Sequence, residues 1–317
     1  MKNVHNGMKR TLDLIMKEHH LLPYRQIMHQ VYNDPDVKAF IHKYRSEMSQ
    51  DNLVRSAPKL HEYVQEKNKL KNGQQGLMPG YVPHLVLNDH SISIAYQPTE
   101  HTAEVKRQQA LRDRVHSVAL PKQDQNASLT NFDSQSDSSR STILEAAINF
   151  VGQYENNPNK YHKGLYIYGP LGVGKTFLLA AIANKLAKDG YESALVHFPT
   201  FAVEMKASIS DNSTARKIRS IEQAPVLMLD DIGANVMSSW IRDDIFSVIL
   251  EYRMQNEMPT FFSSNFSMND FAKTRLSYDT RGDEDPLNAK RIMERIRFLA
   301  NEYQMLGQNR RNPSQNN

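Results

Sequence analysis

"YIYGPLGVGKTF" (residues 166–177) joins a short apolar run to three glycines, a lysine and a threonine. The chain has only 13 glycines in 317 residues, yet Gly169, Gly172 and Gly174 fall within six positions. Residues 169–176 fit the pattern of a glycine, four residues and then Gly-Lys-Thr, in which backbone N–H groups wrap a phosphate chain. Glycine suits such a loop because side chains would obstruct the approach of the backbone to the anion. We therefore predict a phosphate-binding loop between a strand and a helix.

The residues of this loop predict a triphosphate site that includes Mg²⁺. The helix after the loop points its positive end at the phosphates. Lys175 adds a point charge between the outer phosphates, and the hydroxyl of Thr176 is a ligand for Mg²⁺. The residues expected to contact the nucleotide are Gly169, Pro170, Leu171, Gly172, Val173, Gly174, Lys175, Thr176 and Phe177.

"APVLMLDDIG" (residues 224–233) delivers two carboxylates to the end of an apolar strand. Ligands of open α/β sheets bind at the carboxyl ends of the strands. Asp230 can hold Mg²⁺ through water, and Asp231 can polarise an attacking water. The alternative is that the two carboxylates cap a helix.

"PTFFSSNF" (residues 259–266) is a second strand that ends in polar groups. Asn265 can hydrogen-bond a γ-phosphate or hold the nucleophilic water. Taken alone, an asparagine in a turn is the simpler interpretation. The order of the three motifs favours a phosphate-sensing role.

"AKRIMERIRFLA" (residues 289–300) places Arg291 and Arg295 on one face of a helix, because they are four residues apart. An arginine that reaches a γ-phosphate from a neighbouring subunit stabilises the charge of the transition state. The alternative is a solvated face with Glu294 as partner. Arg310 or Arg311 could add a phosphate contact from the same chain.

The composition excludes several classes of protein. The net charge of +4 is too small to indicate nucleic-acid binding by the whole chain. From residue 290 to the end, however, six basic residues oppose two acidic ones, and this difference of 6 − 2 = +4 equals the excess of the whole chain. An anionic partner near the C-terminus and a solvated basic tail both fit.

Without cysteine there is no disulfide or thiolate metal site. No apolar run is long enough for a membrane span or a signal peptide, so we expect a cytoplasmic protein without membrane insertion.

The chain is predicted to be α/β, with a parallel sheet flanked by helices after a small, mostly helical N-terminal domain. Strands and helices alternate after Gly164, which is typical of a parallel sheet covered on both faces. In residues 33–48, Asp34 is the expected N-cap of a helix with Pro35 at its first position. "SISIAYQP" (residues 91–98) alternates like a strand. The expected boundaries are 1–100 for the N-terminal domain, 101–125 for a connector and 126–317 for the α/β domain.

The motifs "GPLGVGKT", "VLMLDDIG", "PTFFSSNF" and "RIMERI", in this order, resemble the AAA+ ATPases of the helicase-loader branch, the DnaC/DnaI-like family. The resemblance is close over residues 120–312 and weaker in the N-terminal part. It implies ATP as the nucleotide. It also implies the following roles: Walker A for Lys175 and Thr176, Walker B for Asp230 and Asp231, sensor I for Asn265, an arginine finger for Arg295, and a sensor-II-like position for Arg310 or Arg311.

The resemblance further implies a weak, switch-like ATPase that loads a DnaB-type replicative helicase onto single-stranded DNA during replication initiation or restart. The N-terminal domain would hold the helicase, and the ATPase domain would contact DNA and form homo-oligomers. A transposition-type AAA+ ATPase that assists a transposase is the alternative with the same motifs. A small-molecule kinase and a non-hydrolysing ATP-binding adaptor are more distant alternatives.

Two features depart from a simple assignment. The family often carries a cysteine-based zinc site in its N-terminal domain, whereas this region offers only the scattered His61, His84, His90 and His101. We therefore predict no zinc.

Phe198 and Phe201 lie beside Lys206 and could stack on DNA bases, but a core role is the preferred interpretation.

Overall fold

The computed structural model describes residues 22–118, 124–278 and 281–310. The chain divides into two compact units, residues 1–108 and 109–317, and the division falls inside helix α6 (Glu100–Arg114). Residues 101–125, expected as a connector, contain most of α6 and a short strand, β3 (Val115–Val118). Within the described residues, no helix combines the length and apolarity needed to cross a membrane.

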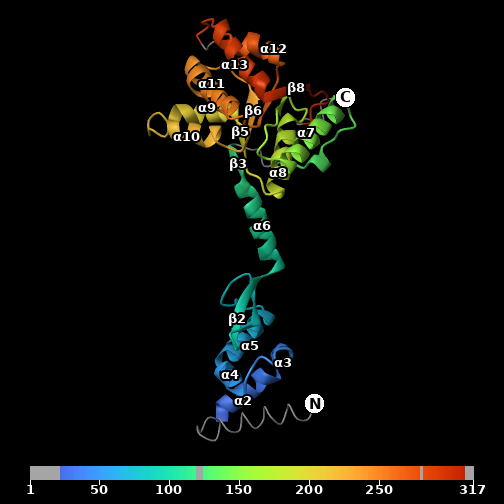
Figure 1. Cartoon of the computed structure of the whole chain (residues 1–317), viewed down its shortest axis with the longest axis vertical. Helices are drawn as coiled ribbons and strands as arrows, with labels where there is room; N and C mark the ends of the chain where they lie inside the picture. Colours follow the sequence, from blue (N-terminus) through green and yellow to red (C-terminus); the bar gives the residue numbers. More distant parts are fainter. Residues whose placement is uncertain (1–21, 119–123, 279–280, 311–317) are drawn as a thin grey trace. The chain divides into compact units, whose positions relative to one another are not determined.

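The first unit is a small helical bundle with one β-hairpin (Figure 1). Asp34 caps the second helix as expected, because its carboxylate accepts the N–H of Asp36 at 3.0 Å. That helix ends at Lys43, before the end of the stretch 33–48, and Met48 packs on the core after a turn. The elements are α2 (Leu22–Asn33), α3 (Pro35–Lys43), α4 (Gln50–Arg55), α5 (Ala57–Lys71), β1 (Tyr81–Asn88) and the expected β2 (Ser91–Pro98).

The second unit is built on a six-stranded parallel sheet with the strand order β3-β5-β6-β7-β4-β8. The four strands expected from apolar runs are β4 (Gly164–Tyr168), β5 (Ser193–His197), β6 (Val226–Ile232) and β7 (Thr260–Ser264). The sequence did not predict the two edge strands, β3 and β8 (Ala300–Gln304). Edge strands are partly exposed, and these two lack the continuous apolar run that marks a buried strand.

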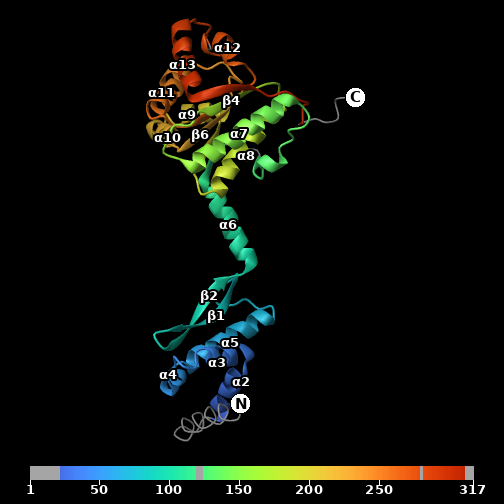
Figure 2. The same cartoon turned by 45° about the vertical axis from the view of Figure 1, so that its right-hand side comes forward.

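Helices cover both faces of this sheet (Figure 2). One face packs on α7 (Ser138–Asn156) and α8 (Lys175–Lys188). The other packs on α9 (Phe198–Ala207), α11 (Ser247–Gln255) and α13 (Pro286–Leu299). Phe198 and Phe201 are each 3% exposed within this second core, so the preferred core role is confirmed. The remaining elements are η2 (Leu129–Asn131), α10 (Thr214–Glu222), η3 (Trp240–Phe246), α12 (Met268–Phe271) and η4 (Ala272–Leu276).

A fully buried arginine fixes the starts of the two central strands. Arg253, near the end of α11, donates hydrogen bonds to the carbonyl oxygens of Glu222, Ala224 and Pro259 at 2.6–2.9 Å and to the hydroxyl of Thr260 at 2.7 Å. Burial lowers the pKa of Arg253 to about 9. Because Ala224, Pro259 and Thr260 lie at the amino ends of β6 and β7, Arg253 ties the starts of both strands to α11.

Candidate nucleotide-binding site

The phosphate loop leaves β4 and enters α8 as the sequence predicted. Gly174 has φ +104° immediately before Lys175, the first residue of α8. This is a left-handed conformation that glycine adopts without a steric cost. A Cβ on Gly169 would lie 2.0 Å from the carbonyl oxygen of Met305. Both positions therefore require glycine for the loop to close over the start of the helix.

Lys175 is folded into the loop that precedes it. Its ammonium group donates hydrogen bonds to the carbonyl oxygens of Gly169 and Pro170 and to the side-chain oxygen of Asn265, each at 2.8 Å. Asn265 is therefore held by the site and is not merely a turn residue. The residue expected to sense phosphate and the lysine expected to bind phosphate are in direct contact.

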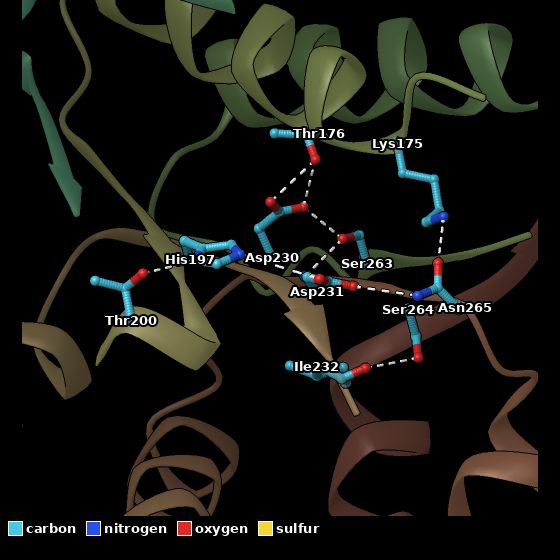
Figure 3. A network of polar contacts seen from close by, with 10 residues as sticks. All are labelled: Lys175, Thr176, His197, Thr200, Asp230, Asp231, Ile232, Ser263, Ser264 and Asn265. Atoms are coloured by element: carbon cyan, nitrogen blue, oxygen red, sulfur yellow. Dashed lines mark hydrogen bonds and ion pairs between the residues drawn. The ribbon is translucent and has the colours of Figure 1, made fainter. Parts of the chain in front are cut away.

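Asp230 lies at the centre of a buried polar network (Figure 3). Its carboxylate oxygens accept the hydroxyl of Thr176 at 3.0 and 3.1 Å, and Oδ1 also accepts the hydroxyl of Ser263 at 2.5 Å. Burial raises the pKa of Asp230, and these two hydrogen bonds partly offset that rise. Its carboxylate and the hydroxyl of Thr176 are hard oxygen ligands that fit Mg²⁺ completed by phosphates and water.

Asp231 joins the same network from the next position in the chain. Its carboxylate accepts the side-chain N–H of Asn265 at 3.4 Å and lies 4.0 Å from Nε2 of His197. The other ring nitrogen of His197 lies 2.8 Å from the hydroxyl of Thr200. The structure thus brings together five of the predicted residues, namely Lys175, Thr176, Asp230, Asp231 and Asn265 (Figure 3).

Sequence reasoning missed three residues of this region. Ser263 and His197 stand at the carboxyl ends of their strands, and that position was the available signal. Arg140 carried no signal, because an arginine near a helix start usually faces solvent. Here it is 1% exposed and donates to the carbonyl oxygens of Asp133 and Val173 at 2.6 Å. Through the bond to Val173, Arg140 stabilises the phosphate loop.

The C-terminal segment runs beside the loop. The backbone N–H of Arg310 donates to the carbonyl oxygen of Gly172 at 3.0 Å. Its guanidinium pairs with Asp133 and holds the pKa of that carboxyl at about 2. Arg311, the alternative sensor-II-like residue, lies outside the described residues.

Arg295 is the expected catalytic residue that is not part of the network. Its guanidinium donates to the carbonyl oxygen of Ser247 and to Glu251, both at 2.9 Å, within the same chain. Glu294, the partner expected for a solvated face, pairs instead with Arg297 at 3.0 Å. The role of Arg295 at a neighbouring subunit stays a prediction.

The described residues contain no group of three or more histidine, cysteine, aspartate or glutamate side chains placed to hold a metal ion. His61 lies 3.1 Å from the side-chain nitrogen of Gln65, and His90 lies 2.7 Å from the carbonyl oxygen of Glu47. The expectation that the chain binds no zinc stays a prediction.

A glycine-lined loop at the start of α8, two aspartates at the end of β6 and an asparagine after β7 define a P-loop nucleotide-binding protein of the AAA+ class. A family model for the "Primosomal protein DnaI N-terminus" matches residues 1–96, and one for the "Bacterial DnaA ATPAse domain" matches residues 137–274. The replicative helicase loader DnaI of Bacillus subtilis (strain 168) is 37% identical over 293 residues, which cover 91% of this chain and 93% of that protein. The chain belongs to the DnaI family of replicative helicase loaders.

Solved structures agree with this assignment. A crystal structure of DnaI has 43% sequence identity and a TM-score of 0.55, and it covers 63% of this chain and 98% of that chain. The crystal structure of the DnaC helicase loader has 24% identity and a TM-score of 0.50, covering 59% of this chain and 100% of that chain. The second likeness shows the fold alone.

Replacing Asp230 by asparagine should stabilise the nucleotide-free protein. A carboxyl whose pKa rises on folding lowers stability at every pH above its ordinary pKa, and asparagine removes the buried charge. We expect Asp230→Asn to raise the melting temperature at pH 7 by a few degrees, since about 1 kcal/mol corresponds to about 2–4 °C for a unit of this size. The gain should shrink as the pH falls towards 4.

The matched control for this measurement is Asp231→Asn, because the Asp231 side chain is 31% exposed and should contribute less. Calorimetry of the two variants from pH 4 to 8 tests the expectation. A lower melting temperature for Asp230→Asn at pH 7 would contradict it.

Proposed function

We propose that this protein is an ATP-dependent loader that places a DnaB-type replicative helicase on single-stranded DNA during replication initiation or restart. The observation that carries the proposal is the contact network from Lys175 through Asn265 and Asp231 to Asp230 and Thr176, in a chain whose N-terminal residues match a loader family. Such a network is arranged for a triphosphate and a metal ion. ATP with Mg²⁺ supplies the phosphoanhydride bond and the charge that the site is built to neutralise.

Each residue of the network has a distinct task in this proposal. The ammonium of Lys175 leaves the loop carbonyls and turns to the outer phosphates. Thr176 and Asp230 would hold Mg²⁺, Asp231 would polarise the attacking water, and Asn265 would orient that water or hydrogen-bond the γ-phosphate. Binding and hydrolysis then act as a switch between two states of the loader, because the two nucleotide states differ in charge at one contact network.

The two alternatives considered from the sequence differ in their partners. The match of residues 1–96 to a DnaI N-terminus supports a helicase as the partner over a transposase. Co-elution of the full chain with its host's replicative helicase distinguishes the two. A chain that binds helicase and DNA but releases no phosphate would be an adaptor.

Lys175→Ala should abolish ATP binding and helicase loading. The substitution removes the point charge for the outer phosphates. Lys188→Ala is the matched control, because Lys188 is exposed at the far end of the same helix. The measurement is ATP-dependent helicase unwinding of a single-stranded circle carrying an annealed strand. Normal loading by Lys175→Ala would refute the proposal.

A basic helix supports the contact with DNA. Arg216 and Arg219 are exposed on α10, and Lys206 is exposed at the end of α9, near the exposed apolar side chain of Val203. Positive charge beside apolar surface suits a flexible strand with phosphates and unpaired bases.

Arg216→Ala/Arg219→Ala should weaken binding of single-stranded DNA. Each lost phosphate contact reduces the slope of log K against log salt by about 0.7, so the pair should reduce it by about 1.4. Lys185→Ala/Lys188→Ala on α8, which covers the opposite face of the sheet, is the control with the same charge change. Anisotropy titrations of a labelled oligonucleotide at several salt concentrations measure the slope. An unchanged slope in the α10 variant would exclude this surface.

Arg295 is proposed to complete the site of a neighbouring subunit in a homo-oligomer. Arg295→Ala should bind ATP normally but hydrolyse it at least about tenfold more slowly when helicase is present, because an arginine finger acts on the transition state. Arg297→Ala is the control, since Arg297 is exposed on the same helix. Phosphate release at saturating ATP is the measurement. A wild-type rate in Arg295→Ala would remove this residue from the mechanism.

A further inference from the structure

Asp230 and Asp231 occupy adjacent positions of a strand, yet both belong to one network. Successive side chains of a regular strand point to opposite faces of the sheet. The pairing of β6 with β7 shows how the chain escapes this rule. Leu229 pairs with Phe262, and Ile232 pairs with Ser264, so both aspartates face the single residue Ser263. This two-against-one register is a β-bulge.

The bulge changes the backbone at Asp231. Its φ is +59°, in the left-handed region that residues other than glycine rarely adopt. This left-handed conformation directs the carboxylate of Asp231 towards Asn265. The carboxylate thus lies on the same side of the sheet as that of Asp230. The bulge also removes the N–H of Asp231 from the regular ladder of hydrogen bonds between the strands.

Ser263 replaces the lost ladder bond and ties the two aspartates together. Its hydroxyl oxygen accepts the backbone N–H of Asp231 at 2.9 Å, and its hydroxyl hydrogen is donated to Oδ1 of Asp230 at 2.5 Å (Figure 3). One oxygen atom thus holds the backbone of one aspartate and the side chain of the other. Ser263 is 1% exposed, so water cannot readily substitute for it.

We propose that Ser263 is the positioning residue of the paired aspartates, a role that rests on the proposed ATPase function. Its contact with Oδ1 of Asp230 fixes the rotation of the carboxylate, so that both carboxylate oxygens lie within hydrogen-bond distance of the hydroxyl of Thr176. Its other contact fixes the backbone that directs the carboxylate of Asp231 towards Asn265; these are the two residues proposed to act on the attacking water. Ser264 differs, because its hydroxyl donates to the carbonyl oxygen of Ile232.

Ser263→Ala tests the proposal in the full-length chain. The variant leaves the phosphate loop intact, so the affinity for Mg²⁺-free ATP should stay within about twofold. Without the hydroxyl, the rate at saturating ATP and Mg²⁺ should fall at least about tenfold, as expected for a lost orienting group. The variant also loses the hydrogen bond that orients the carboxylate of Asp230. The Mg²⁺ concentration that half-saturates binding of a non-hydrolysable ATP analogue should therefore rise.

A buried serine elsewhere in the sheet provides the matched control. Ser193 is 0% exposed at the start of β5, and within the described part of the chain its hydroxyl has no hydrogen-bond partner. Ser193→Ala removes the same atom from the same sheet without touching an aspartate. Its ATPase rate and Mg²⁺ dependence should equal those of the wild type.

Ser263→Thr keeps a hydroxyl on the same carbon and should recover most of the rate that alanine loses. A Ser263→Ala protein with the wild-type rate, or one whose rate and Mg²⁺ dependence change no more than those of Ser193→Ala, overturns the proposal. So does a threonine variant that melts like the wild type but is as slow as the alanine variant. These outcomes differ from a failure of the proposed function, in which the wild-type chain itself releases no phosphate with helicase and DNA.

Discussion

The strand that carries the two aspartates must break its own alternation, and the rest of the site depends on that break. A regular strand would send one carboxylate to the phosphates and the other to the opposite core. The bulge at Asp231 brings both to one side, and the left-handed backbone there is strained, of order 1–3 kcal/mol. Such strain persists only where the surroundings over-determine it. Here the hydroxyl of Ser263 holds the bulge from the next strand, and Arg253 fixes the far ends of both strands to α11.

The sequence predicted the parts of the site that depend on short-range patterns. The loop before Lys175 follows a fixed spacing, and Asp230 and Asn265 end apolar runs that become the central strands. The place of Ser263 near the carboxyl end of an apolar strand could be predicted, but its two contacts could not, because they depend on a register shift that joins it to residues 32 and 33 positions away. The edge strands β3 and β8 were not predicted from the sequence for a related reason. They are short and polar, and they become strands only because a buried neighbour offers them hydrogen bonds.

Two buried arginines show a further limit of sequence reasoning. Arginine usually lies on the surface, and the sequence places Arg140 near the start of α7 and Arg253 near the end of α11. In the folded chain, each donates to several buried backbone carbonyls at or beyond the ends of helices and strands. An unpaired buried carbonyl costs about 1–3 kcal/mol, so one guanidinium that serves several of them offsets much of its own desolvation. Arg140 holds the phosphate loop, and Arg253 holds the starts of β6 and β7. Both arginines therefore help to fix the parts of the chain that carry the site.

The ion pair between Arg295 and Glu251 adds a condition to the proposed action between subunits. Arg295 cannot approach a neighbour's triphosphate while its guanidinium is bonded to α11, so assembly has to exchange one partner for another. The ion pair itself costs little to leave, because the side chain of Glu251 is 47% exposed and a solvent-screened pair contributes about 0–1 kcal/mol. The hydrogen bonds that Arg295 donates to Ser247 must be replaced as well. The gain is larger, since a triphosphate at a subunit boundary carries more charge and is less screened than an exposed carboxylate. In the proposed oligomer, the ion pair with Glu251 would therefore hold the arginine in the free chain without preventing its transfer to a nucleotide-bound neighbour.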